Sequence, residues 1–586
     1  MFQKSMVRKG DIMDIKGTEL FVKALKEEGV DTLFGYPGGY AIDLFDALYE
    51  EEDIQVVLPR HEQALIHAAD GYARSTGKTG VCLVTSGPGA TNLVTGIATA
   101  NYDSVPLVCF TGQVNTNLIG NDAFQEVDIV GITRNICKYA VTVRERKDLG
   151  RIIKNAFYIA RTGKPGPVVV DLPKDIQIAM GSDEYPKEVN IRGYKPSTGI
   201  HAGQLQKAMN VLEQAKKPVF LIGGGVRIAG AGEKLRQLAE KMEIPVITTI
   251  MGKGTLATDH PLYVGNIGMH GNYASNHAIS ECDVLFSIGT RFNDRITGKI
   301  SEFAKNATIV HVDIDTASIS RNIKVDIPIV ADAGVALDAM LELAKPLAVK
   351  EWIAQVHEWK EKYPIQMDAY EGMTPEKIIG VINTYFENLI VTTDVGQNQL
   401  WTTQYLALNE KKQLLTSGGL GTMGYGFPAA IGACIANPDT PVVCISGDGG
   451  VQMNIQELAT AVSLELPVII CIFNNGYLGN VRQWQQMFFD RRYSHTCLRY
   501  RKSCNRNCTK DDSCCPPYTP DFIKLAESYD ASGIRVEKEE DILPALKKAA
   551  ENKNGPTVIE FIIEREANVL PMVPGGNALN DMVLDY

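Results

Sequence analysis

Residues 441–476 read PVVCISGDGGVQMNIQELATAVSLELPVIICIFNNG, and this stretch decides the fold class. Two apolar runs, PVVCIS and PVIICIF, each lead into polar residues, with Asp448 after the first and Asn475 after the second. The segment between them is typical of one crossover helix, so the stretch predicts a β-α-β unit with two parallel strands. Because the carboxyl ends of parallel strands meet at one edge of the sheet, where ligands bind, we expect both side chains at that edge.

The chemistry of these side chains indicates a site for a metal ion and a diphosphate. An Asp and an Asn oxygen suit a hard cation such as Mg²⁺, which usually keeps phosphate oxygens among its ligands. Gly447, Gly449 and Gly450 let the backbone approach a diphosphate closely. The alternative is a tight strand-to-helix turn followed by an Asn-Gly turn, and the pattern alone leaves both interpretations open.

The same alternation of apolar strands and helical stretches runs through all 586 residues. Runs such as VCLVTS, residues 81–86, are apolar throughout, as in strands buried on both faces of a parallel sheet. Polar breaks at 181–199 and near 360–374 separate three rounds of this alternation. We therefore expect an α/β fold of three doubly wound parallel-sheet domains. Their predicted bounds are residues 1–185, 195–355 and 370–586.

Composition narrows the class of protein. Hydrophobic residues make up 45% of the chain and charged residues 22%, which excludes disorder over most of its length. The net charge of −11 argues against nucleic-acid binding, which needs a basic surface. The N-terminus has no apolar run of signal-peptide length, and the longest uncharged stretch, 80–102, is rich in Gly, Ser and Thr. We therefore expect no membrane association and a cytoplasmic protein with reduced thiols.

Three further motifs are candidates for a ligand site but are weak when taken singly. Glu62, in RHEQ, begins a helix predicted over residues 62–76, and a carboxylate at a helix start is often only a partner of the helix dipole. FGYPGG at 34–39 and TSGPGATN at 85–92 are Gly-rich strand-to-helix turns that suit an anion or another polar ligand.

Together these motifs resemble the large subunit of acetohydroxyacid synthase (acetolactate synthase), a family of thiamine-diphosphate enzymes. The resemblance covers essentially the whole chain. A GDGG…NN pair occurs across thiamine-diphosphate enzymes, whereas DAFQE (122–126), RFNDR (291–295) and VRQWQ (481–485) in combination are much narrower. The resemblance implies that the three domains bind, in chain order, the pyrimidine of the cofactor, FAD, and the diphosphate with its metal ion.

For the thiamine-diphosphate site the resemblance implies a role for each matching residue. Glu62 would hydrogen-bond the pyrimidine ring, and an acid in that role should be buried. Met423 would wedge the cofactor into a bent shape, with core filling as the alternative. The Mg²⁺ ligands would be Asp448, Asn475 and the backbone carbonyl of Tyr477. The remaining contacts would come from Gly38, Gly39, Ser86, Gln397, Asn398, Gly449 and Gly450.

The resemblance also places Phe124, Gln125, Lys174 and Trp484 near the reacting centre. The implied enzyme decarboxylates pyruvate and joins the hydroxyethyl unit to a second pyruvate or to 2-ketobutyrate, which is the first common step of branched-chain amino-acid synthesis. Trp484 would favour 2-ketobutyrate, because an aromatic wall gains from an extra methylene. For Lys174 the alternative is a surface lysine that follows a strand.

A structural FAD is implied for the central domain, because the reaction has no net redox step. Gly-rich strand ends suit a pyrophosphate, and Arg291 could pair with it. Lys164 stands where the family has an Arg that touches FAD, and it keeps the charge without the fork geometry. The other matching positions are Gly223, Gly224, Gly225, Thr249, Ile250, Gly268, Met269, His270, Gly289, Asn293, Asp313, Ile314 and Asp332.

The chain departs from the family at two further positions. Asn398 stands where the family usually has His; Asn can donate a hydrogen bond to phosphate but carries no charge. Asn480 stands where the family often has Met, which removes an apolar contact. These differences bear on affinity and not on the class of reaction.

The resemblance implies 2-ketoacid substrates, a homodimer or tetramer with active sites at the subunit interface, and a small regulatory subunit. The alternatives within the superfamily are a flavin-dependent pyruvate oxidase and an FAD-free catabolic acetolactate synthase. A dinucleotide-dependent oxidoreductase is disfavoured, because no G-x-G-x-x-G follows a first strand. A non-catalytic regulatory protein is disfavoured by the intact Glu62, Asp448 and Asn475.

Five of the 12 cysteines lie in an insertion at 497–517 that common family members lack. In a reducing cytoplasm they favour thiolate ligation of Zn²⁺ or of an iron–sulfur cluster over disulfides. Their spacing matches no standard zinc pattern, so a thiol-rich loop stays an equal alternative. The cysteines are Cys497, Cys504, Cys508, Cys514 and Cys515.

Overall fold

The protein is described by a computed structural model that covers residues 14–502, 504 and 520–585. The chain divides into two compact units, residues 1–195 and 196–586. The first unit contains one six-stranded parallel sheet and the second contains two more. The predicted α/β class with three parallel sheets is therefore confirmed, whereas the boundaries drawn at 185, 355 and 370 stay predictions.

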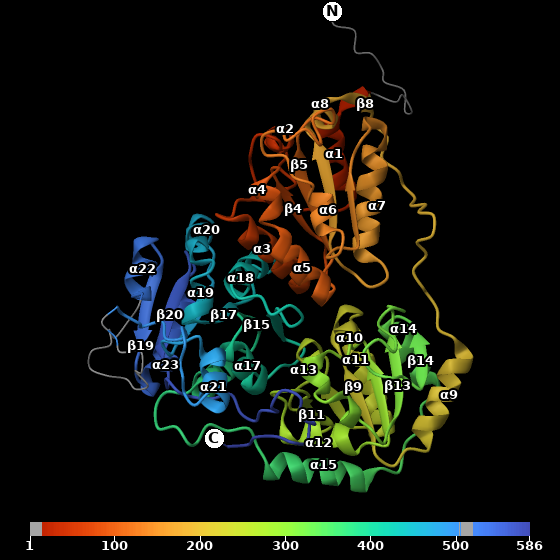
Figure 1. Ribbon diagram of the computed structural model, residues 1–586, viewed down its shortest axis with the longest axis vertical. Helices are drawn as coiled ribbons and strands as arrows, with labels where there is room; N and C mark the ends of the chain where they lie inside the picture. The colour runs from red at the N-terminus through yellow and green to blue at the C-terminus, as the bar shows by residue number, and fades with distance from the viewer. Residues whose placement is uncertain (1–13, 503, 505–519, 586) are drawn as a thin grey trace, which may run out of the picture. The chain divides into compact units, whose positions relative to one another are not determined.

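The first unit is a parallel sheet with helices on both faces. Its strands lie in the order β3 (Gln55–Val57), β2 (Thr32–Tyr36), β4 (Gly80–Val84), β5 (Leu107–Gln113), β7 (Val168–Pro173) and β6 (Tyr139–Thr142). A separate antiparallel pair consists of β1 (Asp14–Lys16) and β8 (Met180–Ser182). The helices are α1 (Gly17–Glu27), α2 (Ile42–Leu48), α3 (Glu62–Thr76), α4 (Pro88–Thr91), α5 (Val94–Asp103), α6 (Ile129–Thr133), η1 (Arg146–Asp148), α7 (Leu149–Arg161) and α8 (Lys174–Ile178). Helices α3 and α5 pack together on one face, and α1 and α7 pack together on the other (Figure 1).

The first sheet of the second unit has the same architecture. Its strands lie in the order β11 (Tyr263–Asn266), β10 (Val246–Thr248), β9 (Pro218–Ile222), β12 (Val284–Ile288), β13 (Thr308–Asp313) and β14 (Ile327–Val330). The helices are α9 (Ala202–Glu213), α10 (Gly224–Ile228), α11 (Gly232–Met242), η2 (Ile250–Gly252), α12 (Tyr273–Glu281), α13 (Asp294–Thr297), η3 (Ile300–Glu302), α14 (Ala333–Leu343) and α15 (Lys350–Lys362).

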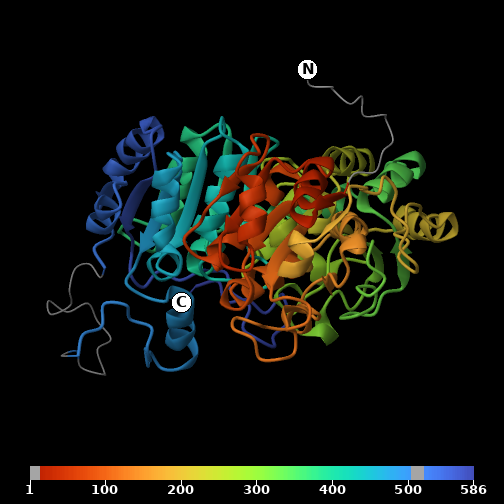
Figure 2. The same cartoon turned by 90° about the horizontal axis from the view of Figure 1, so that it is seen from above.

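The second sheet of this unit carries residues 441–476, the predicted β-α-β unit with Asp448 and Asn475. Its strands lie in the order β16 (Lys412–Thr416), β15 (Leu389–Thr393), β17 (Val442–Gly447), β18 (Ile469–Asn474), β20 (Thr557–Ile562) and β19 (Ser532–Val536). Figure 2 shows these strands, coloured teal to blue, side by side with helices around them. The helices are α16 (Pro375–Tyr385), α17 (Gln397–Tyr405), α18 (Gly426–Ala436), α19 (Asp448–Val451), η4 (Ile455–Glu457), α20 (Leu458–Ser463), α21 (Gly479–Phe488), α22 (Phe522–Ser528), η5 (Glu539–Asp541) and α23 (Ile542–Glu551).

Strand β17 shows why these strands are apolar at every position. Val443 and Ile445 belong to one hydrophobic cluster, and Val442 and Cys444 belong to another. Because successive side chains of a strand point to opposite faces, the two clusters lie on opposite faces of the sheet. A strand covered on both faces has no position for a polar side chain, so its polar residues follow its end.

The connection between β17 and β18 contains the crossover helix expected over 454–465, which the structure forms as η4 followed directly by α20 over residues 455–463. A further short helix, α19, precedes it directly after β17 and was not expected. Asn454 lies between α19 and η4, and its side-chain amide donates to the carbonyl of Gly424 at 2.7 Å. No local signal reveals such a long-range contact.

Each sheet has a topological switch point. This is the place between two adjacent strands from which the chain connections run in opposite directions along the sheet. The switch points lie between β2 and β4, between β9 and β12, and between β15 and β17. Ligands of doubly wound folds bind in the crevice outside the strand ends at this point. The strand order therefore marks one candidate ligand site in each sheet.

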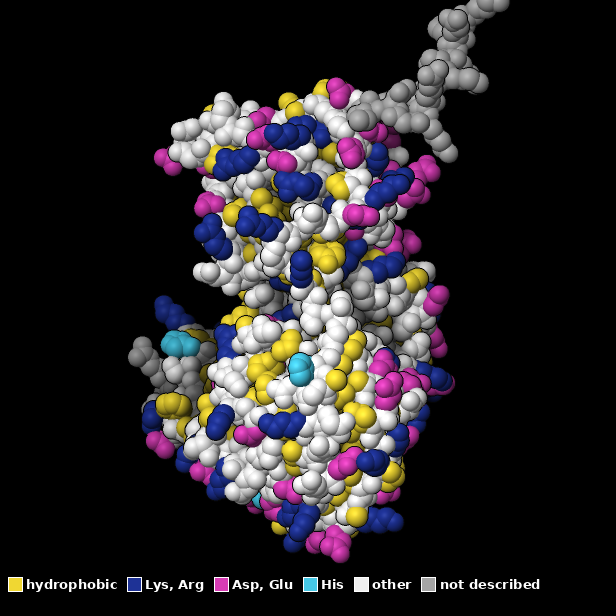
Figure 3. All heavy atoms as spheres, turned by 90° about the vertical axis from the view of Figure 1, so that its right-hand side faces the viewer, with side chains coloured by type: hydrophobic (Ala, Val, Ile, Leu, Met, Phe, Trp, Pro, Cys, Tyr) yellow, Lys and Arg dark blue, Asp and Glu magenta, His cyan; other side chains and the backbone are white. Residues whose placement is uncertain are grey.

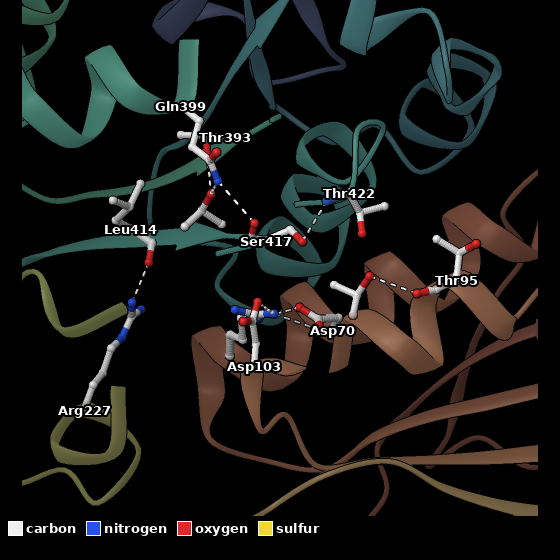
Figure 4. A network of polar contacts seen from close by, with 12 residues as sticks. Asp70, Thr95, Asp103, Arg227, Thr393, Gln399, Leu414, Ser417 and Thr422 are labelled. Atoms are coloured by element: carbon white, nitrogen blue, oxygen red, sulfur yellow. Dashed lines mark hydrogen bonds and ion pairs between the residues drawn. The ribbon is translucent and has the colours of Figure 1, made fainter. Parts of the chain in front are cut away.

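A buried ionic network fixes helix α3, which begins at Glu62, against α5. The Arg74 guanidinium donates to Asp70 at 2.6 and 3.2 Å and to Asp103 at 3.0 Å. The side chains of both acids are at most 1% exposed, and that of Arg74 is 9% exposed. Figure 4 shows Asp70 and Asp103 converging on this cation.

A second close contact joins the ends of β9 and β12. A Cβ atom added at Gly225 would lie 2.7 Å from the Cα of Gly289, and one added at Gly223 would overlap the Gly289 carbonyl oxygen. Gly289 has a φ of 66°, which favours glycine. The switch point of this sheet is therefore lined by bare backbone.

The surface agrees with the composition. Lysine and arginine side chains are interspersed with acidic ones over the face shown in Figure 3. Within residues 14–502 and 520–585, the helices lack the combination of length and apolar character that a bilayer crossing requires.

We expect Arg74→Met to lower the free energy of unfolding of the first unit by about 3–5 kcal/mol, because two buried carboxylates lose their shared cation. The matched control is Arg151→Met, which removes an exposed pair with Asp148 and should cost at most about 1 kcal/mol. Urea unfolding followed by circular dichroism measures both variants. Equal midpoints for the two would contradict this account of the network.

We expect Gly223→Ala to destabilise the protein by about 1–3 kcal/mol, because the added methyl group meets backbone that cannot move aside. The control is Gly380→Ala on α16, where an added Cβ meets nothing within 4 Å and should stabilise by roughly 0.5–1 kcal/mol. Thermal unfolding of the two variants should therefore shift in opposite directions. A wild-type melting temperature for Gly223→Ala would disprove the steric argument.

Candidate functional site

The strand register brings Asp448 and Asn475 to one edge of the sheet, as predicted. Gly447 pairs with Phe473, so the residues that follow both strands leave the sheet side by side. The N–H of Gly476 donates to Asp448 Oδ2 at 3.0 Å, which ties the two turns together. Burial raises the pKa of Asp448 to about 7, because the ionised carboxyl lacks solvent. A buried carboxylate of this kind is stabilised by a cation.

The backbone N–H and carbonyl of Tyr477 face Asn475, at the same edge of the sheet. Tyr477 forms an antiparallel bridge with Cys497. The bonds of this bridge run through its neighbours, from Leu478 N to Thr496 O at 2.9 Å and from Leu498 N to Gly476 O at 2.8 Å. The N–H of Tyr477 instead donates to Asn475 Oδ1 at 3.0 Å. Because the N–H and C=O of one extended residue point to the same side, its carbonyl also faces the Asn475 side.

These donors fit a hard cation. Among the described residues no three His, Cys, Asp or Glu side chains gather into a metal site. The predicted ligands are one carboxylate, one amide oxygen and one peptide carbonyl, which is oxygen chemistry suited to Mg²⁺ that keeps phosphate and water as its other ligands.

The surroundings of Asp448 fit a diphosphate. A Cβ atom added at Gly449 would lie 2.8 Å from Leu478, and one added at Gly450 would lie 2.7 Å from Asp394, so backbone forms this surface. Across the switch point, α17 begins at Gln397 without a side-chain cap. The first N–H groups of an uncapped helix are available to an anion.

Gln397 lies between Asn475, in the turn after β18, and helix α21. Its Oε1 accepts from Asn475 Nδ2 at 3.3 Å, and its Nε2 donates to Gln483 Oε1 at 2.9 Å. Trp484 follows Gln483 on α21, and the Trp484 Nε1 group has no hydrogen-bond partner among the described residues. Gln397 thus links the predicted metal ligand Asn475 to helix α21, the helix that carries Trp484.

Asn398 differs from the expectation that its amide donates to phosphate. Its Nδ2 donates to the carbonyls of Asp394 at 3.0 Å and Ile445 at 3.1 Å, so both N–H groups are used within the protein. A phosphate contact at this position would fall to the backbone N–H of α17.

Met423 lies in the loop that follows β16. It is half-buried, and its methyl group points at Gly449, where an added Cβ would lie 3.9 Å away. A side chain that projects beside the diphosphate surface is placed to contact a bound ligand and not only to fill a core.

In the first unit the predicted residues lie at the carboxyl ends of the strands. Gly38, after β2, packs against Thr85 at the end of β4, and Tyr40 N donates to Thr85 Oγ1 at 3.3 Å. The next residue, Ser86, is fully buried, and its hydroxyl lacks a hydrogen-bond partner within the described part of the chain. An unsatisfied buried hydroxyl at a switch point fits a site that receives a polar ligand.

Glu62 starts α3 as predicted but is half-buried, not buried, in the single chain. Its Oε2 accepts from Asn92 Nδ2 at 2.9 Å, and Oε1 would lie 3.5 Å from a Cβ added at Gly89. The carboxylate therefore faces the TSGPGATN turn with its position fixed on one side.

Phe124 and Gln125 lie on the loop after β5. Phe124 is 80% exposed, an unusual position for a phenylalanine. Gln125 has a φ of 59° and packs against Gly87 of the TSGPGATN turn. The structure thus brings Gln125 beside that turn and leaves the Phe124 ring in solvent.

Lys174 is held in place and is not a loose surface lysine. Its Nζ donates to the carbonyl of Gly39 at 3.1 Å and lies 3.3 Å from Asp43 Oδ2. The glycine of the FGYPGG turn and the lysine after β7 therefore meet, although 135 residues separate them in the chain.

The positions predicted for FAD, apart from Lys164, lie at the carboxyl ends of the strands β9–β14. These strands form the first sheet of the second unit, called the middle sheet below. Asn293 directly precedes α13, and its Oδ1 is buried without a hydrogen-bond partner among the described residues. The bare backbone at Gly223, Gly225 and Gly289 leaves the room that a pyrophosphate needs. These features fit a dinucleotide.

Several other predicted FAD positions have structural partners of their own. Met269 N donates to Arg295 O at 2.8 Å, and His270 Nδ1 lies 3.3 Å from Pro571 O. Asp332 Oδ1 caps α14, and Asp313 Oδ1 accepts from the backbone of Asp315.

The remaining positions in this sheet are Gly224, Thr249, Ile250, Gly268, Arg291 and Ile314. Lys164 follows α7 in the first unit and is half-buried.

Two cysteines of the insertion are described. Cys497 and Cys504 are not in disulfides, and the backbone N–H of Arg501 donates to Cys504 Sγ at 3.2 Å. Cys508, Cys514 and Cys515 lie outside the described residues. The interpretation of the cluster as a metal site stays a prediction.

Two further polar residues, Asp394 and Gln399, were not predicted from the sequence. Both are buried beside the predicted diphosphate contacts, at 1% and 8% exposure. They belong to TDVGQNQ, in which only Gln397 and Asn398 were predicted as ligands. The partners of Asp394 and Gln399 lie outside this motif and are not visible in the sequence.

Comparison with known proteins agrees with this geometry. Three family profiles match the chain: the N-terminal TPP binding domain of thiamine pyrophosphate enzymes over residues 15–132, their central domain over 205–340, and their C-terminal TPP binding domain over 394–561.

Curated relatives match over nearly the full length. A protein of Methanocaldococcus jannaschii named "Probable acetolactate synthase large subunit" is 46% identical, with 97% of this chain and 95% of that protein covered. "Acetolactate synthase isozyme 3 large subunit" of Escherichia coli is 42% identical, with 97% and 98% covered. The protein of Corynebacterium glutamicum named "Acetolactate synthase large subunit" is 43% identical, with 97% and 90% covered. The chain therefore belongs to the thiamine pyrophosphate enzymes and, within them, to the family of acetolactate synthase large subunits.

Proposed function

We propose that this chain is a biosynthetic acetolactate synthase that decarboxylates pyruvate and joins the two-carbon unit to a second pyruvate or to 2-ketobutyrate. The observation that carries the proposal is a chain of hydrogen bonds. It runs from Asp448, after β17, to the turn at 475–477 after β18, and from there through Gln397 to α21, the helix of Trp484. It connects the cation and diphosphate ligands with a residue type suited to an apolar acceptor group.

The cofactors we propose are thiamine diphosphate and Mg²⁺. Asp448, Asn475 and the carbonyl of Tyr477 would hold the metal ion, and the α17 N-terminus with Gly449 and Gly450 would hold the diphosphate. When bound, thiamine diphosphate supplies the carbanion chemistry that releases carbon dioxide and forms the new carbon–carbon bond. The protein contributes orientation and electrostatics.

The residues of the first unit would act on the pyrimidine and the substrates. Glu62 would hold a proton at the pyrimidine ring, and its bond from Asn92 fixes the carboxylate for that task. Lys174 would attract 2-ketoacid carboxylates. The exposed Phe124 and the adjacent Gln125 would line the reacting centre once a partner subunit covers them.

Trp484 would set the preference between acceptors. An indole wall gains roughly 1 kcal/mol from one more methylene, which favours 2-ketobutyrate over pyruvate by several-fold. The Trp484 ring is half-buried, and its buried Nε1 group has no hydrogen-bond partner among the described residues, which supports a bound ligand beside it.

We further propose FAD as a structural cofactor of the middle sheet, together with a homodimer or tetramer. The relatives are named large subunits, which supports a small regulatory subunit as a partner. A cytoplasmic location and the supply of precursors for valine, leucine and isoleucine belong to the same proposal. The competing FAD-free catabolic enzyme and the flavin-dependent pyruvate oxidase use the same thiamine site.

The test of the function is an assay of purified protein with pyruvate, Mg²⁺ and thiamine diphosphate, with and without FAD. We expect acetolactate, more of it with FAD, and preferential use of 2-ketobutyrate when both acceptors are present. Acetolactate from flavin-free protein that gains nothing from FAD would favour the catabolic enzyme. Acetyl phosphate or acetate formed with oxygen uptake would favour the oxidase.

We expect Glu62→Gln to lower kcat by about 100-fold or more, because the amide cannot exchange a proton with the pyrimidine ring. Binding of thiamine diphosphate with Mg²⁺, measured by quenching of tryptophan fluorescence, should stay close to wild type. The control is Glu19→Gln in the first turn of α1, which caps its own helix through Lys16 N and should leave kcat unchanged. Undiminished turnover in Glu62→Gln would refute the proposed role.

A further inference from the structure

The segment from Thr393 to Gln399 makes contacts in two directions. Gln397 and Asn398 belong to the proposed diphosphate contacts, whereas Asp394 and Gln399 reach toward the loop that carries Met423. We propose that Asp394 and Gln399 are positioning residues that clamp this loop, residues 417–424, against the diphosphate surface. The inference rests on the proposed function for the role of Met423, but the clamp itself can be tested without any cofactor.

Gln399 holds the beginning of the loop. Its Nε2 donates to Thr416 Oγ1 at 2.7 Å and to the carbonyl of Ser417 at 3.3 Å. Thr416 Oγ1 also lies 2.7 Å from Thr393 Oγ1, which ties the ends of β15 and β16 together. Figure 4 shows Gln399 reaching from α17 to Ser417, with Thr393 beside it.

The loop closes on itself above this anchor. Thr422 N donates to Ser417 Oγ at 3.0 Å, which Figure 4 also shows. Gly421 and Gly424 have φ values of 75° and 89°, so the chain reverses direction at two glycines. Apart from the buried Thr422, the residues between these ends are partly or fully exposed, so burial alone does not fix the loop.

Asp394 holds the far end of the loop. Its Oδ1 accepts from Gly424 N at 2.9 Å and from Val395 N at 2.7 Å. On the other side of the same glycine, Asn454 Nδ2 donates to Gly424 O at 2.7 Å. Both polar groups of the residue that follows Met423 are therefore held by buried side chains from other loops.

Asp394 also contacts the diphosphate surface. A Cβ atom added at Gly450 would lie 2.7 Å from Asp394 Cγ, so the carboxyl group touches that turn and the Met423 loop at once. Because Met423 points at Gly449, one residue earlier, the position of Asp394 sets the space between the methionine and the diphosphate surface. Asp394 thus holds the Met423 loop and the Gly449–Gly450 turn together, although Asp394 itself belongs to neither of them.

This arrangement predicts that substitutions that remove the acceptor at Asp394 lower kcat without lowering the affinity for the cofactor. Removing the acceptor at Asp394 leaves Asp448 and Asn475 in place, so cofactor affinity should change little. Met423 would lose its fixed position, and a misplaced positioning group lowers kcat far more than binding. Asp394→Asn keeps an oxygen that accepts both N–H groups and should behave like wild type, whereas Asp394→Ala should not.

The first measurement is hydrogen–deuterium exchange of residues 417–424 in protein without cofactors. We expect exchange in Asp394→Ala to be about tenfold faster than in wild type, and in Asp394→Asn to stay within about threefold. Gln399→Leu should accelerate exchange at the same loop. The control, Asn383→Leu, removes an amide that bridges Tyr405 O and Ala407 N elsewhere in the domain and should leave this loop unchanged.

The second measurement compares kcat with the Kd of thiamine diphosphate in the same variants. We expect Asp394→Ala and Gln399→Leu to lose at least about tenfold in kcat while Kd stays within about threefold, with recovery in Asp394→Asn. Wild-type exchange in Asp394→Ala, or equal behaviour of the Asn and Ala variants, would overturn the clamp. Faster exchange with unchanged kcat would overturn the positioning role. Met423→Ala with full activity and wild-type exchange would instead refute the proposed function of Met423.

Discussion

The burial of parallel strands on both faces is the constraint on which the rest of this structure depends. A strand such as β17, whose alternate residues pack into two separate clusters, has no position for a polar side chain along its length. Polar chemistry is therefore confined to the turns at the strand ends. Within those turns, the reversal of strand order opens one crevice in each sheet. The turns that carry Asp448 and Asn475, the FGYPGG and TSGPGATN turns, and the glycines of the sheet β9–β14 all lie at these crevices.

A crevice positions turns only approximately, and buried polar contacts between turns supply the remaining precision. Gly476 N donates to Asp448, Gln397 joins Asn475 to α21, and Lys174 joins the end of β7 to Gly39. Within the second unit, Arg227 donates to Leu414 O at 2.5 Å and so ties the glycine turn after β9 to β16 (Figure 4). Each bond is worth about 1 kcal/mol in stability, but each also removes one way in which a loop could move.

How far the sequence predicts the structure follows from the range of the interactions. The α3 boundaries, Glu62 to Thr76, and the parallel strands around Asp448 depend on local pattern, and both are confirmed. The crossover helix expected after β17 is also confirmed, over residues 455–463. Asp394 and Gln399 were missed because their partners, Gly424, Thr416 and Ser417, lie outside their own turn. Their residue types are unremarkable, and their importance lies in which loops they join, which periodicity and spacing do not encode.

Asn398 shows how a change of residue type can leave a site intact. The family usually has a histidine here, and a charge lost beside a diphosphate would weaken binding if the side chain were a ligand. In this chain both N–H groups of the amide hold backbone carbonyls of the switch point, at Asp394 and Ile445. An anion at this place would meet the N-terminal N–H groups of α17, which every residue except proline provides. The side chain then serves to hold the end of β15 against β17, a task that needs two neutral donors and no charge. The substitution is therefore compatible with a diphosphate site, because the helix end, and not the side chain, would meet the anion.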